Sequence, residues 1–229
     1  MFKKLKRKFA SYQEKKRLSN MFAAFDGLKT KHYPRGWNWI DRVYIEDFLE
    51  KNKKYICGDI LEFKENLYAT KFGHDIKTVD IVTHPSDINN KKAKYFMDIS
   101  QLEKLPSEKY DCIICTQVLP FIYDYEQGIA GLHKLLKPGG HLLVSVPGLI
   151  ALVATSEMQE TGHFYGFSPQ TMQRSFVKYF KNFSVSSYGN AKAAMLLVGF
   201  GDSELLPKEE LLRESPDHII TVTILAEKE

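Results

Sequence analysis

The stretch that decides the fold is residues 108–148, which read EKYDCIICTQVLPFIYDYEQGIAGLHKLLKPGGHLLVSVPG. A short apolar run at 112–115 leads into a loop at 116–124, and an amphipathic helix is predicted over 125–136. A Lys-Pro-Gly-Gly turn and a second apolar run at 142–146 follow. This order predicts a βαβ unit with two parallel strands and a right-handed crossover. Ligands in such sheets bind beyond the carboxyl ends of the strands, so chemistry is expected at the loop.

Strand-like runs recur along the rest of the chain and alternate with helical segments. The predicted strands cover 55–63, 76–82, 95–97, 112–115, 142–146, 184–188 and 218–225. The predicted helices cover 41–51 (with Asp41 as N-cap), 65–72, 99–105, 125–136 and 169–180. This alternation indicates an α/β fold whose mostly parallel sheet has helices on both faces. Because two strands follow the final long helix, we expect seven strands with an antiparallel edge strand.

Charge is distributed unevenly along the chain. The net charge is +4, yet residues 1–20 carry eight Lys/Arg and one Glu, whereas the remainder carries 24 Lys/Arg and 27 Asp/Glu. Phe2, Leu5, Phe9 and Tyr12 recur at spacings of three and four, which predicts a basic amphipathic helix. Two interpretations are open: the helix binds anionic lipid at a membrane surface, or it is a tail that is partly ordered or rests on the body. RNA binding by this segment is less favoured, because the slightly acidic body adds no basic patch.

Length and composition fit one globular unit with a short appendage. The 229 residues, 44% of them apolar, divide into a basic segment, 1–20, and one domain, 21–229. The sequence contains no run of 18 apolar residues, so it predicts no membrane-spanning helix. The charged N-terminus lacks the apolar core of a signal peptide. Three cysteines indicate a reducing, cytoplasmic compartment. Cys112 and Cys115 are three residues apart in a strand, so they should point to opposite faces of the core and bind no metal.

Motifs elsewhere in the chain add a resemblance to a known family. They are Arg35-Gly36, Ile40-Asp41-Arg42, Tyr44-Ile45-Glu46, Gly58-Asp59-Ile60-Leu61-Glu62, Tyr68, Phe72-Gly73, Asp80, Asp98, 111–122, 135–140 and Tyr188-Gly189-Asn190. In this order and spacing the chain resembles class I S-adenosylmethionine (SAM) dependent methyltransferases over residues 35–228. More narrowly, it looks like a bacterial group associated with glycosyltransferases and surface-polysaccharide genes. The resemblance implies a Rossmann-like class I methyltransferase fold and SAM as cofactor.

The resemblance also assigns cofactor contacts to the ends of the strands. The assigned residues are Glu62, Lys64, Asp80, Asp98, Ile99, Thr116 and Gln117. Asp80, 18 residues beyond Glu62, would accept both ribose hydroxyls, and Asp98 would accept the adenine amino group with Ile99 beside the ring. Thr116 and Gln117 would supply polar contacts from the loop after the fourth strand. The alternatives are a solvated carboxylate for Glu62, a turn aspartate for Asp80, a helix N-cap for Asp98 and an ordinary loop at 116–123.

Lys64 departs from the pattern of the family. It stands where these proteins carry a glycine, the residue that lets the backbone approach the cofactor closely. Two roles are open for its ammonium: pairing with the cofactor carboxylate, or filling the pocket. Two functions are therefore open as well. One is a SAM-dependent methyltransferase, and the other is a non-catalytic methyltransferase-like scaffold or partner module with a degenerate cofactor site.

The expected reaction is O-methylation of a small polar or sugar acceptor, for which a base removes the hydroxyl proton. His163 and Tyr165 follow the fifth strand and are the predicted catalytic residues, with His84 less favoured. His133, on the crossover helix, and His141, at the start of a strand, are expected to be structural.

The resemblance further implies a role in surface-glycan synthesis. The expected partners are a small-molecule or glycan acceptor, a glycosyltransferase, and the inner membrane face through residues 1–20. No nucleic-acid substrate is expected, because the body is slightly acidic. A nicotinamide-dependent oxidoreductase is disfavoured, because no GxGxxG motif follows the first strand.

Overall fold

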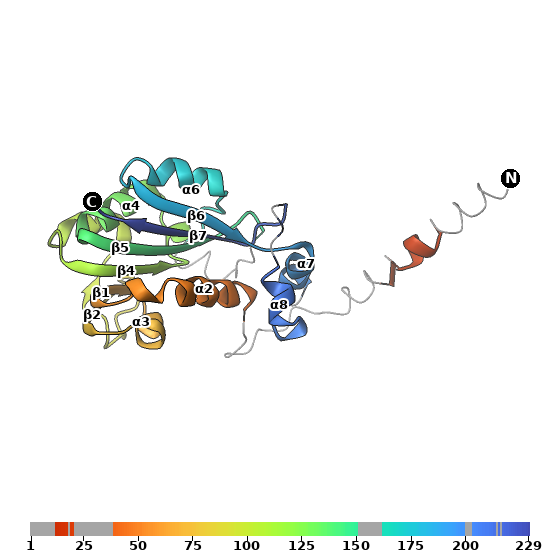
Figure 1. The fold of residues 1–229 in the computed structure, drawn as a ribbon, viewed down its shortest axis with the longest axis horizontal. Helices are drawn as coiled ribbons and strands as arrows, with labels where there is room; N and C mark the ends of the chain where they lie inside the picture. The colour runs from red at the N-terminus through yellow and green to blue at the C-terminus, as the bar shows by residue number, and fades with distance from the viewer. Residues whose placement is uncertain are drawn as a thin grey trace.

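Seven strands form one sheet in the order β3-β2-β1-β4-β5-β7-β6 (Figure 1). The structure is a computed structural model that describes residues 12–17, 19–20, 39–150, 162–199, 203–213, 215 and 217–229. The strands are β1 (Gly58–Phe63), β2 (Ile76–Thr83), β3 (Tyr95–Phe96), β4 (Tyr110–Thr116), β5 (Leu136–Pro147), β6 (Asn182–Tyr188) and β7 (Thr221–Glu227). Strands β1 to β5 pair in parallel, and β7 pairs antiparallel with β5 and β6. The predicted α/β fold with a seven-stranded, mostly parallel sheet is confirmed.

The antiparallel strand lies one position inside the edge of the sheet, not at the edge itself. Strand β7 is buried over almost its whole length, whereas exposed and partly buried residues alternate along β6. A continuous apolar run suits a strand that is covered on both sides, and an alternating run suits an edge. The burial pattern therefore explains why β7 inserts between β5 and β6 even though β6 precedes it in the chain.

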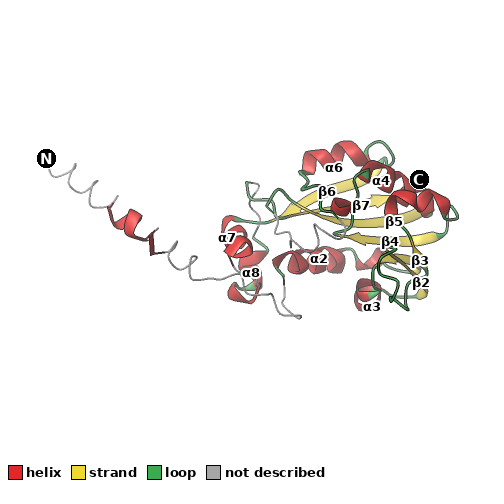
Figure 2. Cartoon of the chain, turned by 180° about the vertical axis from the view of Figure 1, so that it is seen from behind, coloured by secondary structure: helices red, strands yellow, loops and turns green. Residues whose placement is uncertain are grey.

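Helices cover both faces of the sheet (Figure 2). They are α2 (Ile40–Lys51), α3 (Leu67–Phe72), α4 (Tyr125–Leu135), α6 (Pro169–Phe176), α7 (Ala191–Gly199) and α8 (Lys208–Leu211), with short 3₁₀ helices η1 (Lys53–Tyr55), η2 (Ile99–Lys104), η3 (Leu119–Phe121) and η4 (Ser203–Leu205). One core lies between the sheet and η2, α4 and α6. The other lies between the sheet and α2, α3, α7 and α8.

The two central cysteines follow from this layering. Cys112 is buried in the core beside α2, and Cys115 is buried in the core beside α4. The prediction that they point to opposite faces is therefore confirmed. Burial without a counter-charge raises the pKa of both thiols well above the usual value, which keeps them protonated and unreactive.

Helix ends differ in part from those expected. Helix α2 begins at Ile40, so Asp41 lies in its first turn and the prediction of Asp41 as N-cap is wrong. By contrast, Asp124 caps α4 and Ser168 caps α6 through side-chain oxygens that accept backbone N–H groups. The segment predicted as a helix at 99–105 is the 3₁₀ helix η2.

The Lys-Pro-Gly-Gly sequence lies within β5 instead of between the helix and the strand. Tyr110 pairs with Leu136, and only two residues further along β4 Cys112 pairs with His141, so the extra residues form a bulge. Gly139 has a φ of 75°, and its N–H donates to Lys228 O at 2.7 Å. Gly139 therefore has a left-handed backbone, as glycine can adopt without strain, but α4 has already ended before it.

Several sequence features lie outside the described residues. They include Phe2, Leu5 and Phe9 of the basic segment, Arg35-Gly36, and residues 151–161 before His163. Of the basic segment, residues 12–17 and 19–20 are helical and exposed. Among the described helices, none combines the length and the apolar character needed to cross a membrane.

Asn190 joins the segment after β6 to two helices. Its Oδ1 accepts the Ala193 N–H at 3.0 Å at the start of α7, and its Nδ2 donates to Glu210 O at 2.8 Å and to Arg213 O at 2.9 Å. Only 8% of the residue is exposed, so water cannot replace these partners readily.

The substitution Asn190→Ala should lower the free energy of unfolding by about 3 kcal/mol, because it leaves buried backbone groups of two helices without partners. Urea unfolding followed by circular dichroism measures the change. Asn182→Ala, at the exposed start of β6, is the matched control and should change the stability by less than about 0.5 kcal/mol. Equal midpoints for the two variants would contradict the structural role of Asn190.

Candidate active site

The strand order changes direction between β1 and β4, which makes this point of the carboxyl edge the topological switch point of the sheet. These strands lie side by side, but β1 continues into α3 on one face while β4 leads to η3 and α4 on the other (Figure 1). Such a switch point is where open α/β sheets bind their ligands. Lys64 is the first residue after β1, and Gln117 is the first residue after β4.

Both residues have a left-handed backbone. Lys64 has a φ of 69° and Gln117 a φ of 53°. The Lys64 N–H donates to Val82 O at 2.8 Å, and Asn90 Nδ2 donates to Lys64 O at 2.6 Å. The Gln117 N–H donates to Ser145 O at 2.8 Å. The turn after β1 therefore keeps the backbone shape of a glycine turn although its side chain is lysine, at a cost of about 1–2 kcal/mol.

Glu62 joins β1 to α3. It is only 2% exposed, and its two carboxylate oxygens accept the N–H groups of Tyr68 at 2.9 Å and Ala69 at 2.8 Å, at the start of α3. Burial raises the pKa of Glu62 to about 7, against the opposing effect of the two N–H groups. The alternative of a solvated carboxylate is therefore wrong. Glu62 shapes the turn in which Lys64 lies.

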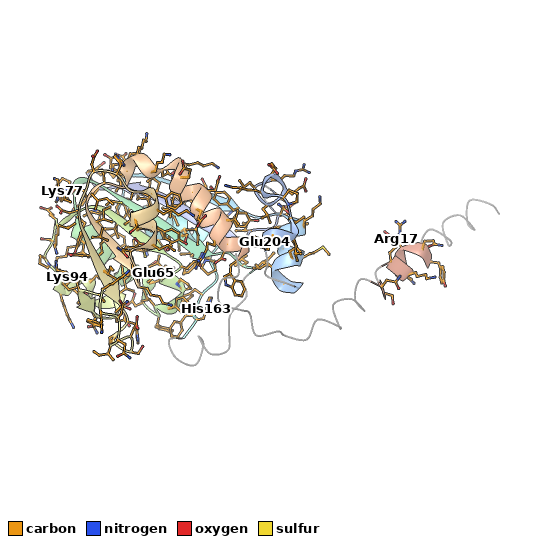
Figure 3. All side chains as sticks on the ribbon, turned by 90° about the horizontal axis from the view of Figure 1, so that it is seen from below. Arg17, Glu65, Lys77, Lys94, His163 and Glu204 are labelled. Atoms are coloured by element: carbon orange, nitrogen blue, oxygen red, sulfur yellow. The ribbon has the colours of Figure 1, made fainter. Side chains whose placement is uncertain are left out.

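Asp80 lies three residues before the end of β2, but its carboxylate is already engaged. Lys94 Nζ, Lys109 Nζ and Tyr110 OH all contact it, the first at 2.8 Å. Burial raises the pKa of Asp80, but the hydrogen bond from Lys109 and those from Lys94 and Tyr110 outweigh burial and hold it below its usual range. Tyr110 begins β4, whereas Gln117 follows the end of that strand. Figure 3 shows Lys94 at the left edge of the body and His163 near its middle. Asp80 is thus the centre of an ion-pair cluster that includes the start of β4.

The first acid after β2 is Asp87, in the turn that follows Thr83, and sequence reasoning missed it. Asp87 Oδ2 accepts a hydrogen bond from Thr83 Oγ1 at 3.0 Å, and the neighbouring Asn90 reaches across to Lys64 O. The loop after β2 therefore contacts the turn after β1. The signal in the sequence was the Ser-Asp-Ile-Asn-Asn run after Pro85, which is rich in turn-forming residues.

Asp98 and Ile99 follow β3. Asp98 Oδ1 accepts the Ser100 N–H at 2.8 Å, so the N-cap alternative is confirmed. Its Oδ2 has no hydrogen bond within the described part of the chain, which leaves one oxygen for a ligand. Ile99 is 5% exposed and belongs mainly to the core beside α4.

Two buried nitrogen atoms at the carboxyl edge lack partners. Gln117 Nε2 and His163 Nδ1 are both inaccessible to solvent and make no hydrogen bond among the described residues. Thr116, the last residue of β4, precedes Gln117. A buried donor without a partner costs about 1–3 kcal/mol, and native proteins keep few of them. These atoms fit a site completed by a bound polar molecule.

The two predicted catalytic residues differ in their surroundings. The His163 ring meets the Phe121 ring edge-on, with centroids 5.3 Å apart, beside the loop after β4. Tyr165 OH donates to Tyr123 O at 2.8 Å, and desolvation and neighbouring groups raise the pKa of Tyr165. A tyrosine whose proton is engaged in this way is a poor base, so the structure favours a positioning role for Tyr165. Of these two residues, only His163 has a polar side-chain atom, Nδ1, that makes no hydrogen bond among the described residues.

The two histidines that were expected to be structural, His133 and His141, are both in aromatic contacts. His133 packs edge-on against Phe180 at 4.9 Å, and His141 stacks on Tyr55 at 4.0 Å. Desolvation lowers the pKa of both imidazoles. These contacts agree with the structural roles that the sequence suggested.

Comparison with known proteins identifies the family. A family model described as a methyltransferase domain matches residues 57–182, so the chain belongs to the methyltransferase-domain family. SAM is the cofactor of this protein class. The chain is also 31% identical over 85 residues to the S-adenosyl-L-methionine-dependent Diels-Alderase iccD of Talaromyces variabilis. This match covers 32% of this chain and only 29% of that protein.

Solved structures share the fold at low identity. A SAM-dependent methyltransferase from Archaeoglobus fulgidus matches with a TM-score of 0.52 and 12% identity over 81% of this chain and 93% of its own. A SAM-dependent methyltransferase from Mesorhizobium loti matches with a TM-score of 0.52 and 14% identity over 82% of this chain and 98% of its own. These likenesses confirm the fold of a class I methyltransferase.

The residues at the switch point fit the cofactor in most respects. The left-handed turn after β1, the free Oδ2 of Asp98 and the unpartnered Nε2 of Gln117 would hold it between β1, β3 and β4. The exceptions are Asp80, which is occupied by lysines, and Lys64, whose side chain stands where close approach is needed. The loop after β2 offers Asp87 in place of Asp80.

The substitution Lys64→Gly should stabilise the protein by about 1 kcal/mol, because glycine adopts a φ of 69° without the strain that a Cβ imposes. Thermal or urea unfolding measures the gain. Lys64→Ala removes the same charge but keeps the Cβ, so it should leave the stability nearly unchanged. A destabilised Lys64→Gly protein would mean that the lysine side chain itself supports the turn.

The buried carboxyl of Glu62 should make stability depend on pH. Its pKa is about 7 in the folded protein and near 4.5 when unfolded, so the unfolded state loses its proton first and stability falls as the pH rises between these values. Glu62→Gln cannot titrate. Its unfolding free energy relative to the wild type should therefore improve by about 2 kcal/mol between about pH 5 and about pH 8.

Urea titrations across this pH range measure the relative change, which is separate from any constant loss caused by the altered hydrogen bonds. Glu103→Gln is the matched control, because Glu103 is exposed on η2 and should leave the pH profile unchanged. Parallel profiles for Glu62→Gln and the wild type would refute the raised pKa.

Proposed function

We propose that this protein transfers the methyl group of SAM to a hydroxyl oxygen of a small polar or sugar acceptor in surface-glycan synthesis. The observation that carries the proposal is the pair of unpartnered buried nitrogens, Gln117 Nε2 and His163 Nδ1, at the carboxyl edge of a methyltransferase fold. Gln117 Nε2 suits a contact with the cofactor, and His163 Nδ1 suits removal of the proton from the acceptor hydroxyl. The glycan context rests on the resemblance to the bacterial group described above.

Methyl transfer requires the protein chiefly to position the acceptor against the methyl group of SAM. When bound, SAM supplies a methyl carbon activated by the adjacent positive sulfur. The chain must hold the acceptor oxygen in line with that carbon, which is a positioning effect. His163 Nδ1 would take the hydroxyl proton as the oxygen attacks, and Phe121 holds the ring edge-on. Tyr165 would position the loop through its hydrogen bond to Tyr123 O.

A second function is favoured by Lys64. A lysine at the closest point of cofactor approach would suit a methyltransferase-like module that acts as a scaffold or partner of a glycosyltransferase. The Diels-Alderase relative is described as SAM-dependent, which suggests that cofactor binding and methyl transfer need separate tests. Restored SAM binding in Lys64→Gly, against none in the wild type, would favour the scaffold.

We also propose that residues 1–20 bring the protein to an anionic membrane surface on the cytoplasmic side. The described residues 12–17 and 19–20 support this, since they are helical and exposed and include Lys15, Lys16 and Arg17. A lipid-linked acceptor would then be presented to the domain at the surface where it is made.

Calorimetric titration with SAM and with S-adenosylhomocysteine tests the cofactor site. The wild type should bind with micromolar affinity, and Gln117→Ala should bind at least about tenfold more weakly because it removes a buried donor. Gln173→Ala, on the exposed side of α6, is the matched control and should bind like the wild type. No binding by the wild type at millimolar ligand would refute the enzyme proposal.

Methyl transfer is tested on the same samples with SAM labelled in the methyl group and an extract of the producing cells. Label should enter a glycan or lipid-linked fraction. The substitution His163→Gln should lower the rate by about a hundredfold or more while SAM binding stays unchanged. His74→Gln, an exposed histidine before β2, is the control. Unchanged transfer by His163→Gln would remove this residue from the mechanism.

A further inference from the structure

A group of aromatic rings beside His163 has exposed surface that the fold does not use. Tyr123, in the loop after β4, is 74% exposed, and Phe164, next to His163, is 48% exposed. Their rings meet edge-to-face with centroids 5.5 Å apart. We call Tyr123 and Phe164 the aromatic platform. Large apolar side chains are usually buried, so two adjacent exposed rings next to a candidate active site point to a ligand.

Hydrogen bonds and a ring contact hold the backbone of the platform in place. The Phe164 N–H donates to Pro120 O at 2.8 Å, which ties the two loops together. Tyr165 OH donates to Tyr123 O at 2.8 Å, and the Tyr165 ring packs edge-on against Tyr125 at 5.1 Å. Ordered backbone under both rings means that they would not have to be ordered again when a ligand binds, which reduces the cost of binding.

Edge-to-face contact also determines what the platform presents. In a pair with rings at 83° to each other, the edge of one ring meets the face of the other, so ring surface remains open to the outside. The open face of an aromatic ring is electron-rich and attracts weakly positive C–H groups. The Tyr123 hydroxyl makes no hydrogen bond within the described residues, so it can contact a hydroxyl of a ligand.

The charges around the platform argue against an anionic ligand. Lys178 is paired with Glu126 at 2.6 Å, and Asp124 caps α4 through the Gln127 N–H. The two segments that carry the platform, 117–129 and 162–168, include Asp124 and Glu126 but no Lys or Arg, so they offer no cation to a phosphate or a carboxylate. A ligand that fits has C–H groups for the rings, hydroxyls for the polar atoms and no net charge.

We propose that the aromatic platform binds a neutral sugar ring of the acceptor, with its C–H face on the open face of one ring, the other ring beside it, and a hydroxyl toward His163. This rests on the proposed function and narrows its acceptor class to neutral glycosides. The ring faces supply affinity that tolerates different sugars, while His163 and the Tyr123 hydroxyl select among hydroxyl positions.

Saturation-transfer NMR on the full chain, loaded with S-adenosylhomocysteine, tests the platform. The probes are methyl glycosides of the common neutral hexoses and deoxyhexoses, with catechol as a flat aromatic ring and glucose 6-phosphate as an anion. At least one neutral glycoside should bind, and Tyr123→Ala and Phe164→Ala should each weaken it at least about tenfold. Tyr123→Phe should weaken it less, since it keeps the ring and removes only the hydroxyl.

Two variants provide matched controls. Tyr12→Ala removes an exposed tyrosine of the N-terminal segment, and Phe96→Ala removes an exposed phenylalanine of β3, so both should bind glycosides like the wild type. Calorimetry with S-adenosylhomocysteine on every variant keeps the two proposals apart. Intact binding of S-adenosylhomocysteine without any glycoside signal would refute the platform and leave the methyltransferase proposal standing.

Three further outcomes would also overturn the platform proposal. One is glycoside binding that is equal in the wild type and both platform variants. Another is platform-dependent binding of catechol but of no glycoside, which would assign the rings to a flat aromatic acceptor. The third is platform-dependent binding of glucose 6-phosphate alone, which would assign them to a charged sugar.

Discussion

The buried carboxylate of Glu62 is the contact on which the candidate site depends most. It accepts two N–H groups at the start of α3, and so fixes the angle at which the chain leaves β1. That angle places Lys64 in its left-handed conformation, where β2 and Asn90 hold it from the other side. A charged or half-charged group inside a core is costly unless it is hydrogen-bonded. The fold accepts this cost at the turn that SAM would approach.

Lys64 and Gln117 show how a site can keep its backbone while its side chains change. Both flank the switch point between β1 and β4, and both have positive φ, which most residues avoid. Strain of this kind persists only where the surroundings over-determine it. The turn after β1 has the backbone shape of a glycine turn but carries the cationic side chain of Lys64. The site is therefore preserved in shape and altered in charge, which is why SAM binding and methyl transfer are separate questions.

The fold was predictable because periodicity and turn residues agreed along most of the chain. The burial of Cys112 and Cys115 in different cores followed from strand alternation alone. The surroundings of Asp80 were not predictable in the same way, because a spacing of 18 residues from Glu62 does not say which groups contact its carboxylate. The strand ends at Thr83, and the first acid after it is Asp87. The ion pairs of Asp80 with Lys94 and Lys109 and the free nitrogen of Gln117 depend on tertiary contacts that no local pattern contains.

The place of β7 between β5 and β6 has a consequence for synthesis. Strands β5 and β6 leave the ribosome before β7 does, and neither can pair across the gap until residues 221–227 have emerged. Until then both have an open hydrogen-bonding edge, and β5 also has an unfilled apolar flank. Such intermediates are prone to aggregate or to pair with a second chain. The slow step in making this protein should therefore be the late insertion of one strand into a nearly finished sheet.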